Sequence, residues 1–188
     1  ASDIPSEIAC MSRTGKMMGL KRADVVDLAK SLQRKLLLKS TPHYHQERML
    51  WNGLADHTLP ALIAQCIDSD DVINAVNFAR THDLLVTVRG GGHGISGKAI
   101  ANDALLIDLS KMSNLSANPL TMVATAQAGV LLRELDVGTQ AHGMAVPAGV
   151  VSHTGVAGLT LGGGIGINMR KMGLTSDNLL SVQIVTAD

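Results

Sequence analysis

The groups best suited to chemistry gather in two glycine-rich segments of the chain. Residues 90–97 hold five glycines around His93, directly after Arg89, and residues 149–166 hold seven more. Twelve of the 19 glycines therefore lie in two short stretches. Glycine lets a backbone approach a partner closely, and consecutive N–H groups can then converge on an anion. The first segment is therefore predicted to bind a diphosphate. Arg89 would add positive charge at the entrance of the loop, and His93 is the nucleophilic side chain within it.

Other interpretations of the first segment need features that the sequence lacks. Residues 92–97 satisfy GxGxxG and continue as GK, but Ala99 stands where a P-loop needs a hydroxyl. Only residues 98–103 separate Gly97 from the next predicted strand, too few for the crossover helix of a Rossmann or P-loop fold. A strand–loop–strand arrangement is favoured. A tight turn with a surface histidine is the alternative for this segment taken alone.

The elements that position these segments alternate between strand and helix patterns. Apolar and β-branched runs predict strands at 84–88, 104–109, 121–128 and 181–186, and a short buried segment at 61–67. Helical spacing predicts helices over 69–79 and 130–142, with Gly143 just past the second. The glycines of 149–166 disfavour a stand-alone helix, because each costs about 1 kcal/mol there. The fold class is therefore α+β.

The N-terminal residues are predicted to form an arm of their own. Residues 1–48 carry nine basic and five acidic side chains, although the whole chain is balanced at 16 of each. Apolar residues at helical spacing predict a helix that begins after Asp24 and ends before Ser40; they are Val25, Leu28, Leu32 and Leu36. We expect a helical arm over 1–48 and a second domain over 49–188.

Composition excludes several classes of function. Balanced charge argues against nucleic-acid binding, and no apolar run approaches the ~20 residues that span a bilayer. Cys10 and Cys66 form no CxxC pair and are expected to be buried free thiols. The histidines at 43, 45 and 57 are expected to be exposed, so no metal site is predicted. No secretory signal is visible at the start of the chain, which favours a cytoplasmic location.

Taken in order, these segments resemble one family over almost all of the chain from residue 45. The matching stretches are WNG at 51–53, VTVRGGGHGISG at 86–97, LLIDLSKM at 105–112, QAG at 127–129, and the runs 141–166 and 170–188. They resemble the FAD-binding (PCMH-type) domain of the vanillyl-alcohol oxidase class, in its berberine-bridge-enzyme-like branch, which includes the hydroxynicotine oxidases. The resemblance implies two small α/β subdomains, with the chain stopping before the rest of that domain and before the substrate domain.

The resemblance also implies roles for particular residues. His93 would be joined through a ring nitrogen to the 8α-methyl of the flavin, as a single linkage, because Val151 stands where some relatives carry a second attachment cysteine. His153 would be a positioned hydrogen-bonding residue, and Thr154 would gate the access of oxygen. The implied FAD-binding residues are Arg89, Gly90, Gly91, Gly92, His93, Gly94, Gly97, Gly149, Ser152, His153, Thr154, Gly155, Gly158, Leu161, Gly162, Gly163 and Gly164.

The function implied by the resemblance is that of a covalent flavoprotein oxidoreductase. Such a protein takes hydride from a small-molecule alcohol, sugar or amine, with dioxygen as the acceptor, and the cofactor supplies the redox chemistry. No catalytic base is assigned, because in this class it comes from the substrate domain, which would lie in the same or another chain. Two alternatives stay open: a flavin-binding module without turnover, and a nucleotide-phosphate-binding domain that uses the GxxxxGK-like loop.

Overall fold

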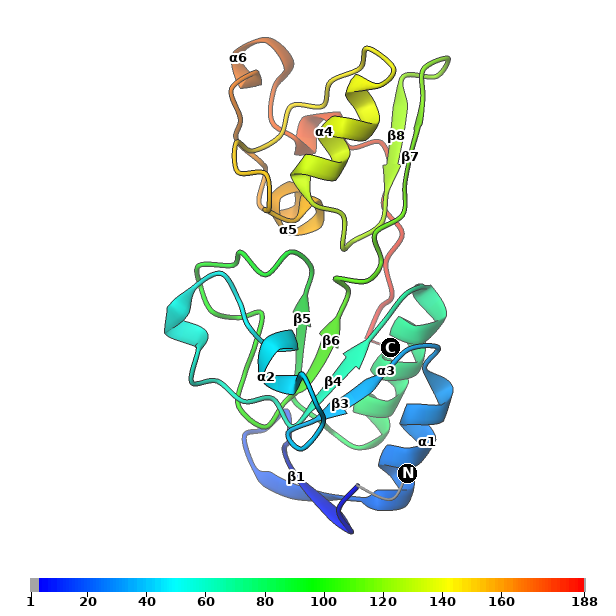
Figure 1. Cartoon of the computed structure of the whole chain (residues 1–188), viewed down its shortest axis with the longest axis vertical. Helices are drawn as coiled ribbons and strands as arrows, with labels where there is room; N and C mark the ends of the chain where they lie inside the picture. Colours follow the sequence, from blue (N-terminus) through cyan, green and yellow to red (C-terminus); the bar gives the residue numbers. More distant parts are fainter. Residues whose placement is uncertain (1–3, 188) are drawn as a thin grey trace. The chain divides into compact units, whose positions relative to one another are not determined.

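The computed structural model describes residues 4–187, which divide into two compact units (Figure 1). The first unit contains the described residues up to Arg89, the segment Gly94–Lys111 and the last residues from Val185. The second unit contains Gly90–His93 and Met112–Ile184. Mixed strands and helices occur in both, so the predicted α+β fold class is confirmed. No helix within residues 4–187 is both long and apolar enough to cross a membrane.

A four-stranded sheet organises the first unit, in the order β3-β4-β6-β5. Its strands are β3 (Leu36–Leu38), β4 (Leu62–Gln65), β5 (Val86–Arg89) and β6 (Leu105–Asp108). β4, β6 and β5 are parallel, and β3 is antiparallel to β4. The two inner strands are buried along their whole length, as continuous apolar runs require when both faces of a sheet are covered.

Opposite faces of this sheet are covered by different elements. On one side, α1 (Arg22–Ser31) contacts α3 (Ser69–Thr81), which in turn contacts β6 (Figure 1). On the other side, α2 (Tyr44–Glu47) places Tyr44 in a cluster with Leu37, Ile63 and Leu106. The hydroxyl of Tyr44 donates to the carbonyl oxygen of Pro60 at 2.5 Å. Burial raises the pKa of Tyr44 to about 12, so the hydroxyl stays a donor throughout the physiological range.

Both cysteines of the first unit are free and buried, which confirms the sequence-based expectation. Burial raises the pKa of the Cys10 thiol to about 11 and that of Cys66 to about 12. Neither thiol is therefore a thiolate near neutral pH, and both behave as small apolar side chains.

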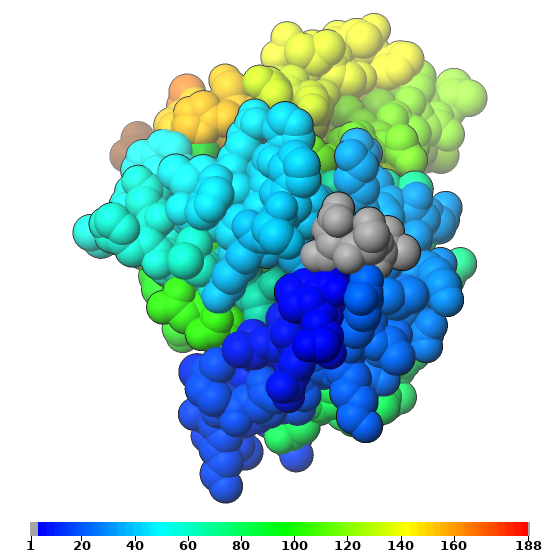
Figure 2. Space-filling model, turned by 60° about the horizontal axis from the view of Figure 1, so that its bottom comes forward, coloured from blue at the N-terminus to red at the C-terminus, as the bar shows by residue number. Residues whose placement is uncertain are grey.

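The prediction that residues 1–48 form a helical arm is wrong, because the described part of this segment also contains strands. β1 (Glu7–Met11) and β2 (Met17–Lys21) form an antiparallel hairpin, which is dark blue at the surface in Figure 2. Its end is tied to the sheet region because the N–H of Leu85 donates to Met11 at 2.8 Å. The predicted helix ends at Ser31, since the residues from 36 on pair with β4 as β3. Residues 1–3 of this segment lie outside the described residues.

The second unit combines one hairpin with short helices. Its elements are β7 (Leu115–Asn118), β8 (Val123–Ala126), α4 (Leu132–Gln140), α5 (Val156–Leu161) and α6 (Met169–Met172), together with a 3₁₀ turn at Ser176–Asn178; a second 3₁₀ turn, Gly53–Ala55, belongs to the first unit. The core consists of Val130, Leu132 and Leu135, against which Leu115 and Leu159 pack. At the start of α4 the carboxylate of Glu134 accepts from the N–H of Leu131 at 2.8 Å, which satisfies one of the amides that a helix end exposes.

Several predicted elements changed in detail. The helix expected over 130–142 and the strand expected over 121–128 are confirmed as α4 and β8, and Gly143 has a φ of +67° after the helix. The strand predicted at 181–186 is wrong: the described residues there form no strand and are largely exposed. β7 was not predicted, because a four-residue stretch with two polar residues carries little strand signal.

The connection between β5 and β6 also departs from expectation. The strands on either side of the first glycine segment are parallel neighbours, although no helix joins them. The whole stretch 90–104, and not only residues 98–103, serves as the crossover, which satisfies the dozen or so residues that a parallel connection needs. The conclusion that no helix follows this loop is confirmed, so the loop lacks the helix N-terminus of a Rossmann or P-loop site.

The buried hydroxyl of Tyr44 provides a test of this packing. We expect Tyr44→Phe to lower the free energy of unfolding by about 1–2 kcal/mol, because the carbonyl of Pro60 is left without its donor. Urea unfolding followed by circular dichroism measures the loss. Val137→Ala, at a position of α4 that is 72% exposed, is the control and should change stability by no more than about 0.5 kcal/mol. Equal effects of the two substitutions would contradict the role of this hydrogen bond.

Candidate functional site

The first glycine segment presents backbone N–H groups with no partner from the protein. In the described part of the chain, the amides of Gly90, Gly91, Gly92 and Gly94 donate to no backbone carbonyl and to no side chain. Gly92 has a φ of +72°, a conformation that lets successive N–H groups turn toward one side. A donor array of this kind suits the oxygens of a phosphate. The segment is therefore compatible with the diphosphate cradle that the sequence predicts.

Within the second unit, the first glycine segment touches the second at backbone level. A Cβ on Gly91 would lie 2.3 Å from the nitrogen of Gly155, and a Cβ on Gly155 would lie 2.5 Å from the nitrogen of Gly91. Real Cβ atoms do not approach so closely, so both positions require glycine. The second segment is held there by α4: Thr154 accepts from Leu132, and Val156 donates to Val130, each at 2.9 Å.

This contact brings two predicted site histidines together. Nε2 of His93 lies 2.6 Å from Nδ1 of His153, and the two ring centroids are 4.6 Å apart. Burial lowers the pKa of His93, and the positive charge that His153 carries when protonated lowers it further. The lowered pKa favours the neutral form of His93, in which an imidazole nitrogen has a lone pair available. The role of His153 as a positioned hydrogen-bonding residue stays a prediction, and the short contact with His93 supports it.

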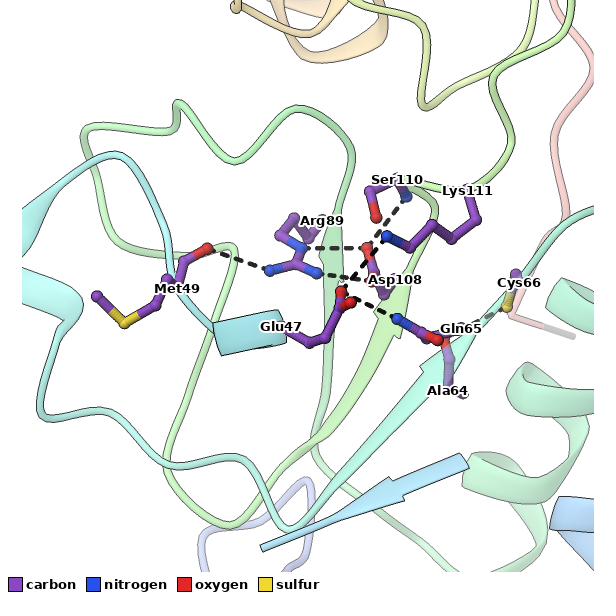
Figure 3. A network of polar contacts seen from close by, with 9 residues as sticks. All are labelled: Glu47, Met49, Ala64, Gln65, Cys66, Arg89, Asp108, Ser110 and Lys111. Atoms are coloured by element: carbon purple, nitrogen blue, oxygen red, sulfur yellow. Dashed lines mark hydrogen bonds and ion pairs between the residues drawn. The ribbon is translucent and has the colours of Figure 1, made fainter. Parts of the chain in front are cut away.

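The side chain of Arg89 does not supply charge to the loop, which corrects the sequence-based expectation. Its guanidinium forms a two-pronged pair with Asp108 on the neighbouring strand, at 3.0 and 2.6 Å (Figure 3). Nη1 of Arg89 also donates to the carbonyl of Met49 at 3.2 Å. Both charged side chains are buried, with side-chain exposures of 7% for Arg89 and 0% for Asp108. The pair therefore closes the end of the sheet, and the positive charge is neutralised inside the first unit.

Further polar side chains extend this pair across the strand ends. Asp108 also accepts from the N–H of Ser110 at 3.0 Å, which shapes the chain as it leaves β6 (Figure 3). Glu47 accepts from the amide of Gln65 at 3.1 Å and lies 3.5 Å from the ammonium of Lys111. Sequence reasoning did not single out Asp108. The signal available was a carboxylate at the end of an apolar strand, which cannot stay buried without a cation.

The remaining predicted residues lie along α5 and the turns around it. Contrary to expectation, 156–161 is helical, with Gly158 exposed inside it and Leu161 79% exposed at its end. Ser152 and Thr154 precede this helix, and Gly149 lies earlier, where a Cβ would come within 2.7 Å of Leu159. Gly162, Gly163 and Gly164 follow the helix. Gly97 closes a turn in the first unit by donating to Gly94.

Two residues near the end of the chain have a local role. Asp177 accepts from the N–H of Leu174 at 2.8 Å, and the amide of Asn178 donates to the carbonyls of Met172 and Leu174, each at 2.9 Å. These contacts shape the turn at this point. Within residues 4–187, no group of three or more His, Cys, Asp or Glu side chains could hold a metal ion.

Comparison with known proteins identifies the class to which this fold and site belong. A family profile described as an FAD-binding domain matches residues 60–188. The chain is 37% identical over 162 residues to an FAD-linked oxidoreductase of Dictyostelium discoideum, covering 86% of the chain and 35% of that protein. It is 31% identical over 157 residues to the (R)-6-hydroxynicotine oxidase of Paenarthrobacter nicotinovorans, covering 84% and 34%. The structure of the Physcomitrella patens BBE-like 1 protein matches with a TM-score of 0.79 at 31% identity, covering 85% of this chain and 35% of that one.

The chain belongs to the FAD-binding domain family of the FAD-linked oxidoreductases. The resemblance to the berberine-bridge-enzyme-like branch and its PCMH-type fold is confirmed by the structural neighbours. The chain spans about a third of the length of the curated relatives that it matches.

The buried pair of Arg89 and Asp108 gives a second test. We expect Arg89→Met to lower the free energy of unfolding by about 3–5 kcal/mol, because Asp108 would remain buried without its cation. Combining it with Asp108→Leu removes both charges, and the double variant should recover much of the loss. Urea unfolding of both proteins measures the difference. A double variant less stable than Arg89→Met alone would contradict this account of the pair.

Proposed function

We propose that the loop 90–94 binds the diphosphate of FAD and that His93 forms a single covalent bond to the flavin. The observation that carries the proposal is the row of amides at Gly90, Gly91 and Gly92, which have no protein acceptor in the described residues. The lowered pKa of His93 supports it, because attachment needs a neutral imidazole. Membership of an FAD-binding family supports the choice of ligand.

In this proposal the residues act through backbone groups as much as through side chains. The amides of the loop bind phosphate oxygens, and the segment from Gly149 to Gly164 contacts the remainder of the cofactor. When bound, FAD supplies the redox chemistry by accepting hydride from a C–H bond of an alcohol, sugar or amine. The protein's part is to hold the cofactor in place and to exclude water. We assign no catalytic base to this chain.

The acceptor and the setting belong to the same proposal. We propose dioxygen as the electron acceptor, a cytoplasmic location, and a substrate domain in the same or another chain. The oxidase that the relatives include supports the choice of dioxygen. A flavin-binding module without turnover is the alternative that the site residues accommodate equally. The nucleotide-phosphate alternative lacks support, because no helix begins at the loop.

The covalent attachment can be tested by colour. Protein incubated with FAD and then precipitated with acid should give a yellow pellet, and His93→Ala should release that colour into the supernatant. His142→Ala, another histidine of the second unit and an exposed one, is the matched control and should keep the pellet yellow. A colourless wild-type pellet would contradict the covalent linkage, whereas retention of FAD before acid treatment tests binding itself.

The proposed reaction with dioxygen can be tested at Thr154, which is partly buried. We expect Thr154→Ile to slow reoxidation of the FAD-loaded, chemically reduced protein several-fold, because the larger side chain occupies space that dioxygen needs. Thr154→Val has nearly the same size as threonine and is the control. Stopped-flow absorbance measures the rate. Equal reoxidation rates for the isoleucine and valine variants would contradict the proposal that Thr154 controls the access of dioxygen.

A further inference from the structure

His93 and His153 of the second unit make a closer contact than the proximity of their loops alone would require. Their nitrogens are 2.6 Å apart, which is a short hydrogen bond between two neutral rings or between one neutral and one charged ring. Two protonated rings cannot make this contact, since both nitrogens would then be donors. One ring must therefore accept from the other.

We propose that His153 is a positioning residue that accepts a hydrogen bond from Nε2–H of His93 and so presents Nδ1 of His93 as the nucleophile toward the flavin. This inference rests on the proposed covalent attachment. A neutral imidazole carries one N–H, and its other nitrogen holds the reactive lone pair. A partner that fixes the proton on Nε2 therefore decides which nitrogen attacks.

The backbone explains why the two rings meet. His93 follows Gly91 by two residues, and His153 precedes Gly155 by two residues, so the contact between these glycines sets the spacing of both side chains. On the other side of His153, the carbonyl of Ser152 accepts from the N–H of Arg133 at 2.9 Å. His153 thus lies in a turn that the start of α4 holds from both sides. Its imidazole needs no movement of the fold to reach His93.

Covalent attachment would use His93, His153, the flavin and dioxygen. The lone pair of Nδ1 forms a bond to the 8α carbon of the flavin, and one proton of the 8α-methyl group passes to solvent. Two electrons enter the flavin, and dioxygen, the proposed acceptor, takes them up. As positive charge develops on the His93 ring, its Nε2 proton shifts toward Nδ1 of His153. The acceptor role of His153 therefore stabilises the charge that attachment creates.

Two substitutions of His153 distinguish its role as a hydrogen-bond acceptor for His93 from a purely structural role. His153→Ala removes the acceptor. His153→Asn keeps an oxygen at the δ1 position, where the ring nitrogen of His153 lies, but an amide cannot take up the proton. We expect covalent attachment to slow by about tenfold or more in His153→Ala, since a positioned proton acceptor contributes on the order of 10²–10⁴ in rate. The rate for His153→Asn should lie between those of wild type and His153→Ala.

The attachment rate is measured as the fraction of protein that gains the mass of one FAD over time. FAD bound before attachment is measured separately by its release on unfolding, and the attachment rate is expressed per molecule of bound FAD, because His153 lies in the segment assigned to the cofactor. Attachment at the wild-type rate in His153→Ala would overturn the proposal. A loss of attachment fully accounted for by a loss of bound FAD would overturn it as well, because His153 would then act only by holding the cofactor.

A second readout needs no cofactor. Nitrogen chemical shifts of the imidazoles in the FAD-free protein report which nitrogen of His93 carries the proton. We expect Nε2–H in wild type and in His153→Asn, and a mixture of tautomers in His153→Ala. A wild-type ring protonated on Nδ1 would overturn the inference. If wild-type protein binds no FAD, the proposed function fails while this tautomer measurement still decides the role of His153.

Discussion

The contact between the backbones at Gly91 and Gly155 is the constraint on which the candidate site depends. Because a Cβ at either position would lie within 2.5 Å of a backbone nitrogen, the two glycine segments meet without any side chain between them. The same contact sets the spacing of His93 and His153, and the unpartnered amides of Gly90, Gly91 and Gly92 directly precede His93 in the chain. Replacement of one glycine would therefore disturb a turn, a helix entrance and a pair of rings together.

In the first unit, two adjacent buried strands end in charged residues, whose charges must be compensated. Arg89 and Asp108 are the last residues of adjacent parallel strands, and each satisfies the other where water does not reach. Charge is thereby removed from the start of the loop that follows β5. Anion binding by that loop would then rest on backbone dipoles, which are weaker than a cation but fixed in direction. The sequence-based expectation was the opposite, an arginine that adds positive charge at the entrance of the loop.

Much of the fold was predictable because its signals are local. A continuous apolar run predicted β6, helical spacing with early acidic residues predicted α3, and the residues of β4 were predicted to be a short buried segment. The errors arose where tertiary contacts decide the secondary structure. The chain from residue 36 on forms β3 because β4 lies beside it. The segment at 181–186 forms no strand, because no described strand pairs with it. For the site, glycine spacing located the loops and the resemblance assigned His93. The partners of Arg89 and His93 depend on contacts across the sequence that no local pattern encodes.

The wide separation of His93 and His153, 60 residues apart in the chain, has a consequence for the order of folding. Local elements such as α4 and the β7–β8 hairpin can form early, whereas a contact of this sequence separation closes late because its loop entropy must be overcome first. A ligand that recognises the closed contact binds only the completed fold and adds its binding free energy to it. Cofactor supply would then act on this protein as a check on finished folding as well as a requirement for chemistry.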